Sequence, residues 1–167
     1  SPGICECGVA LDDRGYHRLC CTRTIRHHTR HREIVRTWSQ LFAEAGHSVP
    51  RRNVERLLRR TVVPVANDDQ RRVDLVLDNT SVVKGLPVLI DVSCVSPITR
   101  YATARSGSLT RNGGALNHAE QMCLTRDYPE AAACPAVALR SVGVEVFGRW
   151  SRHSLQLVQA LCRETFT

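Results

Sequence analysis

The stretch that most constrains the fold runs from Arg71 to Pro97 and reads as two apolar strands joined by a turn. Val73 to Leu77 alternates and is rich in β-branched residues, and Val88 to Val95 is apolar enough to be a central strand. The turn between them is bounded by Asp78-Asn79 and by Gly85-Leu86-Pro87. The sequence therefore predicts a hairpin at the centre of the fold.

Each predicted strand carries one acid, Asp74 in the first and Asp91 in the second. A carboxylate in a buried strand is costly unless it is paired, hydrogen-bonded or bound to a metal. Antiparallel pairing about the turn places Asp74 roughly opposite the segment from Asp91 to Ser93. Two carboxylates at one place suit a divalent cation, which hydrolysis of a phosphodiester needs. The alternative is that Asp74 pairs only with Arg71 or Arg72, and that Asp91 caps the edge of a strand ladder.

The charge of the chain favours an anionic partner. The 167 residues are enough for one domain with a core, and their formal net charge is +7. Lys84 is the only lysine, and the arginines that supply the remaining positive charge suit bidentate contacts with phosphate. We expect no signal peptide and no membrane span, because no apolar run is long enough. The start at Ser-Pro-Gly, without methionine, indicates a piece of a longer polypeptide.

Cysteines gather near the N-terminus, where Cys5, Cys7, Cys20 and Cys21 surround a turn and His17. Without a secretion signal, such cysteines favour metal binding over disulfides. Cys5, Cys7, His17 and Cys21 predict a tetrahedral zinc site, with Cys20 as the substitute for Cys21. The alternative is a set of reduced thiols in a poorly ordered tail. The other four cysteines, interpreted as buried thiols, are Cys94, Cys123, Cys134 and Cys162.

Residues 22–46 have the spacing of an amphipathic helix, with apolar side chains recurring from position 28 and Gly46 as terminator. His27 and His31 are four residues apart, which allows a shared metal, although we favour partly solvated residues at a helix start. Arginine and histidine near a helix N-terminus also suit a phosphate. The predicted nucleic-acid contacts in this segment are Arg26, His27 and Arg30.

Two basic segments have less regular patterns. Residues 51–60 form either a short basic helix or an extended arm, and Glu55 there is either a third carboxylate of the site or part of an ordinary ion pair. Residues 64–70 are predicted to be a loop. Residues 96–114 are polar and positive without any acid, which fits either a nucleic-acid-facing loop or a flexible connection. The arginines predicted to contact nucleic acid in this loop are Arg100, Arg105 and Arg111.

The rest of the chain adds a helix over Ala115–Leu124 that ends at Tyr128-Pro129-Glu130, a strand over Ala136–Phe147 and a helix over Ser151–Phe166. The predicted fold is an α/β sandwich around a mixed β-sheet flanked by helices, spanning residues 25–167. A small Cys/His knuckle over residues 1–24 precedes it. The expected apolar side of the last helix consists of Leu155, Leu157, Val158, Leu161 and Cys162.

These motifs occur together in a recognisable order. The knuckle is followed by Arg26-His27-His28, by Arg72-Val73-Asp74 on a strand and by Asp91-Val92-Ser93 on the next strand. In this order the chain resembles the C-terminal region of non-LTR retrotransposon proteins that carry a restriction-like endonuclease. In that family a C-C-H-C zinc knuckle follows the reverse transcriptase and precedes a PD-(D/E)XK nuclease domain. The resemblance covers roughly Cys5 to Tyr128 and also fits the final strand and helix.

The resemblance assigns a role to each matching residue. Asp74 takes the place of the aspartate of the PD element, with Val73 where proline is usual, and Asp91 takes the place of the second acid. Ser93 stands where the general superfamily motif has lysine. The zinc positions fall on Cys5, Cys7, His17 and Cys21.

The lysine is where this sequence departs from the family. In the retroelement branch it is usually displaced onto the following helix, a few residues before a tyrosine that matches Tyr128. Residues 120–127 contain no lysine, and Arg126 is the nearest cation. The lysine helps to position the attacking water and stabilises charge on the phosphate, whereas arginine does not deprotonate and is a poor base.

The resemblance implies an endonuclease that nicks target DNA with a catalytic Mg²⁺ or Mn²⁺ and carries a structural zinc. It also implies DNA and RNA as partners, a longer polypeptide with a reverse transcriptase, and a nuclear location. The absent lysine supports an alternative, in which the chain is a catalytically inactive module of the same fold that binds DNA or RNA.

Overall fold

The computed structural model describes residues 3–49, 71–77, 83 and 85–165. The predictions for residues 51–60 with Glu55, for residues 64–70, for Asp78-Asn79 and for Lys84 lie outside these ranges. The described elements are α1 (Tyr16–Cys20), α2 (Ile25–Glu44), β1 (Leu75–Leu77), β2 (Val88–Val95), α4 (Gly114–Met122), the π-helical turn η2 (Cys123–Asp127), α5 (Pro129–Ala133), β3 (Ala138–Glu145) and α6 (Arg152–Thr165).

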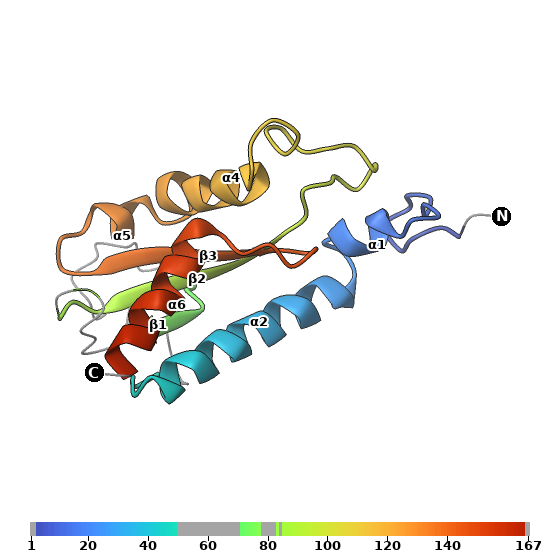
Figure 1. Cartoon of the computed structure of the whole chain (residues 1–167). Helices are drawn as coiled ribbons and strands as arrows, with labels where there is room; N and C mark the ends of the chain where they lie inside the picture. The colour runs from blue at the N-terminus through green and yellow to red at the C-terminus, as the bar shows by residue number, and fades with distance from the viewer. Residues whose placement is uncertain (1–2, 50–70, 78–82, 84, 166–167) are drawn as a thin grey trace.

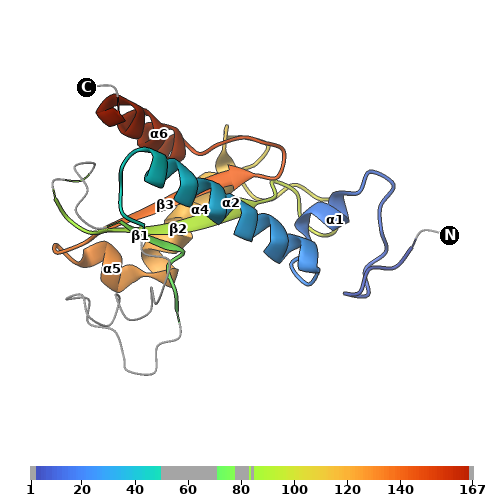
Figure 2. The ribbon, with the colours of Figure 1, turned by 90° about the horizontal axis from the view of Figure 1, so that it is seen from below.

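The sheet is mixed and has the order β1-β2-β3. β1 is antiparallel to β2, with Leu75 opposite Ile90, and β2 is parallel to β3 from the Val88–Ala138 pair onward. Figures 1 and 2 show α2 and α6 on one face of the sheet and α4 and α5 on the other. The predicted hairpin and the predicted α/β fold around a mixed sheet are therefore confirmed at this level.

The face of the sheet under α2 and α6 carries the larger core cluster. The Phe42 side chain is fully buried, and its ring stacks on that of Trp38 with 5.6 Å between the centroids. Because side chains alternate along a strand, Ile90 and Val92 of β2 point into this cluster. The helical spacing predicted for α2 is confirmed, and Gly46 follows the helix with a positive φ of 83°.

The opposite face is covered by α4, η2 and α5. Val76 and Leu89 of the sheet contact Cys123 and Ala131 there in a second apolar cluster. Asp91 lies two residues beyond Leu89 on the same strand and therefore points to this face. None of the helices within the described ranges combines the length and the apolarity that crossing a bilayer requires.

The structure adds two helices that were not predicted and changes the end of a third. α1 and α5 were not expected, and the helix predicted over Ala115–Leu124 leaves the α-helical geometry after Met122. In η2 the backbone N–H of Tyr128 donates to the carbonyl of Cys123, five residues earlier, at 2.9 Å. Such a bond widens the helix by one residue per turn, which propensity alone does not reveal.

The apolar side predicted for α6 is also wrong in part. Leu155 is 50% exposed and Cys162 is exposed, whereas Leu157 and Leu161 are buried. α6 is rotated about its axis relative to the prediction, because buried Ser154 faces β3. The Oγ of Ser154 accepts a hydrogen bond there from the N–H of Gly143 at 2.9 Å. Of the four cysteines interpreted as buried, Cys123 is buried and Cys94 and Cys134 are half-buried.

We expect Phe42→Ala to lower the free energy of unfolding by about 3–5 kcal/mol, because it leaves a cavity between α2 and the sheet. Urea unfolding followed by circular dichroism measures this change. Leu155→Ala, which truncates a half-exposed side chain of α6, is the control and should lower it by less than about 1 kcal/mol. Equal effects of the two substitutions would contradict the packing described for α2.

Candidate functional site

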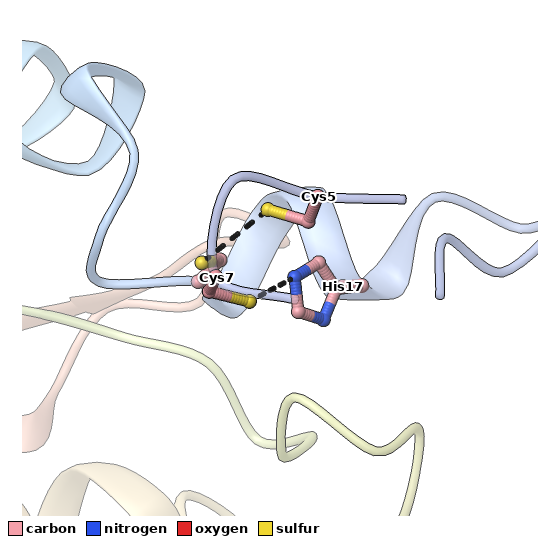
Figure 3. A group of neighbouring side chains, drawn as sticks. Cys5, Cys7 and His17 are labelled. Atoms are coloured by element: carbon pink, nitrogen blue, oxygen red, sulfur yellow. Dashed lines mark hydrogen bonds between the residues drawn. The ribbon is translucent and has the colours of Figure 1, made fainter. Parts of the chain in front are cut away.

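Four metal-ligating side chains meet beside α1. The ligand atoms of Cys5, Cys7, His17 and Cys21 all lie within 4.8 Å of one another. The Sγ atoms of Cys5 and Cys21 are 3.8 Å apart, and Cys7 Sγ is 3.2 Å from His17 Nε2 (Figure 3). Ligand atoms around a tetrahedral zinc ion are separated by roughly 3.5–3.8 Å, given Zn–S of about 2.3 Å and Zn–N of about 2.0 Å. The sulfur and imidazole donors suit zinc, and the cluster is small enough that it could hold such an ion.

Local hydrogen bonds shape this cluster. The backbone N–H of Gly8 donates to Cys5 O at 2.8 Å, and a φ of 84° at Gly8 closes the turn that carries both cysteines. The carboxylate of Asp12 accepts from the backbone N–H groups of Tyr16, at 2.9 Å, and His17, at 2.6 Å. Asp12 thus fixes the start of α1, so that His17 is held against the turn.

The end of α1 separates the two adjacent cysteines. Cys20 is the last helical residue, and its thiol donates to the carbonyl of Tyr16 at 3.1 Å. Cys21 has an extended backbone and turns its Sγ toward Cys5. The cluster therefore contains Cys21, and Cys20 lies outside it.

The protonation of the cluster suits metal binding. A hydrogen bond from the backbone of Cys7 lowers the pKa of Cys5 to about 7, so its thiolate is accessible near neutral pH. His17 Nδ1 lies 2.9 Å from the carbonyl of Arg100 and donates to it, which raises the pKa of His17. The same bond fixes the tautomer that leaves Nε2 free to face Cys7 and a metal.

The two strand acids form a second constellation. The β1–β2 register, continued by one residue, places Asp74 opposite Asp91, as predicted. Asp74 Oδ2 accepts a hydrogen bond from the backbone N–H of Val92 at 2.7 Å. The hydroxyl of Ser93 lies 3.5 Å from Asp91 Oδ2, at the limit of a hydrogen bond. Asp74, Asp91 and Ser93 are thus brought together.

The alternative without a metal assigned an arginine partner to Asp74 and the edge of the strand ladder to Asp91. The structure shows a cap at the ladder edge, but Asp74 forms it. Arg71 pairs with Glu130, with 3.0 Å between Nη2 and Oε1. β1 begins only at Leu75. Where the β1–β2 ladder ends, the Asp74 carboxylate accepts a hydrogen bond from the N–H of Val92. It is therefore Asp74 that caps the ladder edge, while Asp91 lies inside the central strand.

Asp91 is the most strongly perturbed acid of this constellation. Burial, together with the charge of Asp74, raises the pKa of Asp91 to about 6. Burial and the nearby Asp91 raise the pKa of the Cys123 thiol to about 12. Burial and both acids also raise the pKa of Tyr128, whose hydroxyl donates to the carbonyl of Arg72. The charges of both acids act on Tyr128, so its ring lies near them.

His31 is a site residue that the sequence reasoning missed. Its Nε2 lies 2.9 Å from the carbonyl of Val92 and 3.4 Å from Asp74 Oδ2. The contact with Asp74 raises the pKa of His31. His27, four residues earlier, was expected with His31 to be a partly solvated residue at the helix start, and its Nδ1 is instead buried without a hydrogen-bond partner in the described part of the chain. His31 instead turns to the sheet.

Among the described residues, the predicted cations contact groups other than the two acids or are exposed. Arg126 is 68% exposed, and its Nε pairs with Asp127 at 2.7 Å. Arg30 donates from Nη1 to the carbonyl of Leu19 at 2.9 Å, so it attaches α2 to the end of α1. The other arginines predicted to contact nucleic acid are all exposed, and they are Arg26, Arg100, Arg105 and Arg111.

Comparison of the chain with models of protein families, with curated proteins and with solved structures gives no match.

We expect Cys21→Ser to lose bound zinc and Cys20→Ser to keep one zinc per chain, because only the Cys21 sulfur faces the other ligands. Elemental analysis of the two purified variants beside the parent measures this. The two positions are adjacent and both buried, so each variant controls for the other. Zinc lost from Cys20→Ser but kept by Cys21→Ser would contradict the arrangement.

We expect Asp91→Asn to stabilise the metal-free protein at pH 7.5 by about 2–3 kcal/mol and to have no such effect at pH 3.5. The folded-state pKa of about 6 lies above the ordinary value of 3.8, so ionisation of Asp91 as the pH rises favours the unfolded chain. The native carboxyl is therefore harmless below pH 3.8 and destabilising above pH 6.

Denaturant unfolding at several pH values tests this expectation. Glu33→Gln removes an exposed acid of α2 that pairs with Arg36, and should show no comparable pH dependence. An Asp91→Asn variant less stable than the parent at pH 7.5 would show that the charged carboxylate is already well paired.

Proposed function

We propose that this chain is a metal-dependent DNA endonuclease domain of the PD-(D/E)XK kind, from a retroelement-encoded protein. The observation that carries the proposal is the pair of acids on neighbouring strands, Asp74 and Asp91, of which Asp91 is half-buried. The predicted place of this domain beside a reverse transcriptase, its nuclear location and its role in nicking target DNA belong to the same proposal.

The charge around Asp91 supports a cation at this site. Among the described side chains, no arginine or lysine forms an ion pair with Asp91, and the nearby charge of Asp74 adds to the cost of burial. A divalent cation between two carboxylates would offset both costs. Mg²⁺ or Mn²⁺ is the appropriate ion, since both prefer oxygen ligands.

The residues around the acids have distinct tasks in this proposal. The backbone N–H of Val92 and the imidazole of His31 both approach Asp74 Oδ2, so they would hold the carboxylate in place for a cation. Ser93 orients Asp91 from the same strand. A divalent cation held by Asp74 and Asp91 would supply a coordinated water of lowered pKa and would polarise a phosphodiester.

Positive charge is available from a histidine at the site and from arginines elsewhere on the surface. The contact with Asp74 raises the pKa of His31, so its protonated form, which carries positive charge beside Asp74, is favoured by the site. The exposed Arg100, Arg105 and Arg111 are available for the DNA backbone, and the net charge of +7 favours association with it. In this proposal the zinc at the cysteine cluster is structural.

A second candidate is a nucleic-acid-binding module of the same fold that does not cut. It is favoured by one observation: the cation nearest in sequence to the family's lysine position, Arg126, pairs with Asp127 and points to solvent. Without a group that positions the attacking water, binding can persist while hydrolysis is slow.

We expect the zinc-loaded protein to nick supercoiled plasmid DNA in Mg²⁺, and Asp74→Asn and Asp91→Asn to reduce the rate about a hundred-fold or more, because each removes one charge from the cation site. Agarose-gel assays of the nicked product measure the rate. Glu33→Gln is the matched control that removes an acid elsewhere, and it should nick like the parent.

A binding measurement separates the two candidates. We would titrate Mn²⁺ in the absence of DNA, follow thermal unfolding, and expect stabilisation of the parent but not of Asp91→Asn. Absence of nicking together with retained, salt-sensitive DNA binding would favour the non-cutting module. Nicking that persists in both aspartate variants would refute the proposed site.

A further inference from the structure

The segment that follows β2 folds into a tight hairpin whose tip is aromatic and cationic. Ile98 pairs with Ala104 in an antiparallel bridge, and the N–H of Arg105 donates to Pro97 O at 2.9 Å. Within it, Thr99 N–H donates to Thr103 O at 2.7 Å. The predicted loop therefore contains an ordered element between its first residues and Arg105, rather than only a flexible connection.

The tip of this hairpin presents Tyr101 to solvent. Tyr101 is 62% exposed, and the guanidinium carbon of Arg100 lies 4.8 Å from the centre of its ring. The next residue, Ala102, has a φ of 61°, which a residue other than glycine adopts only at some energetic cost. An aromatic ring held outward by a strained turn, instead of packing on the core, is available to a ligand.

The charge of the surroundings indicates the kind of ligand. Residues 96–119 contain no aspartate or glutamate, and Arg100, Arg105 and Arg111 of this segment are exposed. Proteins that bind single-stranded nucleic acid commonly combine exposed arginines with an exposed aromatic ring. The arginines attract the phosphates, and the aromatic face stacks on an unpaired base. Base stacking tolerates any sequence, so no further polar contacts are required.

The hairpin is attached to the cysteine cluster through one hydrogen bond. His17 Nδ1 donates to the carbonyl of Arg100 at 2.9 Å, while His17 Nε2 faces Cys7. His17 is 1% exposed, so the bond is shielded from competing water. Figure 1 shows the chain between β2 and α4 extending toward the end of the molecule that carries α1. A metal that fixes the His17 ring therefore also fixes the residue that precedes Tyr101.

We propose that the hairpin Pro97–Arg105 is a stacking platform for unpaired bases of single-stranded nucleic acid, and that metal binding at His17 holds Tyr101 in place. The proposal shares with the proposed function a nucleic-acid partner but does not depend on strand cleavage. It assigns the Cys/His cluster a task in positioning a binding surface, in addition to stabilising its own fold.

The platform is tested by fluorescence anisotropy with a labelled twelve-nucleotide oligo-dT and with a hairpin duplex, without added Mg²⁺. We expect Tyr101→Ala to weaken oligo-dT binding about five- to a hundred-fold and to change duplex binding less than about two-fold. Tyr101→Phe keeps the ring and should bind oligo-dT like the parent. Leu109→Ala, which truncates an 86% exposed side chain of the same segment, is the control and should also bind like the parent.

The link to the metal is tested with His17→Cys, which supplies a fourth thiolate for zinc but has no Nδ1–H for Arg100. We expect this variant to retain zinc, to bind oligo-dT as weakly as Tyr101→Ala, and to be cut faster by trypsin after Arg100 and Arg105. Cleavage after Arg111, beyond the hairpin, should be unchanged and is the internal reference. If His17→Cys loses zinc, the link is tested instead on the parent protein. Cleavage after Arg100 and Arg105, relative to that after Arg111, is then compared between the zinc-loaded and the zinc-stripped parent, and we expect it to be faster without zinc.

Two results would overturn the proposal. Oligo-dT affinity unchanged in Tyr101→Ala would exclude the stacking platform. The link through His17 would be excluded if the rate of cleavage after Arg100 and Arg105, relative to that after Arg111, were the same with and without zinc. It would also be excluded if this relative rate were the same in zinc-loaded His17→Cys and in the zinc-loaded parent. Neither result bears on nicking, and a protein that fails to nick but loses oligo-dT binding on Tyr101→Ala would fail only the endonuclease proposal.

Discussion

The cost of an ionised Asp91 inside the central strand is the constraint on which the rest of the site depends. Its neighbours on the same face of the sheet include Leu89, the Cys123 thiol and the second carboxylate of Asp74. Leu89 and Asp74 do not compensate a negative charge, and the hydrogen bond from the Cys123 thiol offsets it less than burial opposes it, because apolar surroundings make such a charge expensive. A folded protein that keeps an acid there is therefore poised either to take up a proton or to take up a cation.

The geometry of the site follows from the shortness of β1. That strand has three residues, so β2 extends beyond it, and the backbone groups of Val92 would lack partners at that edge. The Asp74 carboxylate accepts a hydrogen bond from the N–H of Val92, and the His31 imidazole donates one to the carbonyl of Val92. One end of a β-ladder thus becomes the support of a carboxylate, and α2 is joined to the sheet at the same point.

Much of the fold could be predicted because its signals are local. Alternating β-branched residues indicated the hairpin, and acids inside these runs indicated Asp74 and Asp91. His31 could not be predicted to join them, since its contact with Val92 spans 61 residues of chain and depends on how α2 crosses the sheet. The choice between Cys20 and Cys21 likewise required knowing where α1 ends. The turned face of α6 depended on the close contact of Ser154 with Gly143, which hydropathy does not reveal.

The π-helical turn between Cys123 and Asp127 has a consequence for aligning this chain with others. A π-turn accommodates one residue more than an α-helical turn at the same place, so it is equivalent to a single-residue insertion in an otherwise regular helix. Residues on its two sides, such as Glu120 and Tyr128, are therefore out of α-helical phase with each other. A correspondence counted along the sequence from α4 to Tyr128 therefore shifts by one position across the turn. One position is about 100° around an α-helix, so a side chain sought at a fixed spacing before the tyrosine would be sought on a different face of the helix.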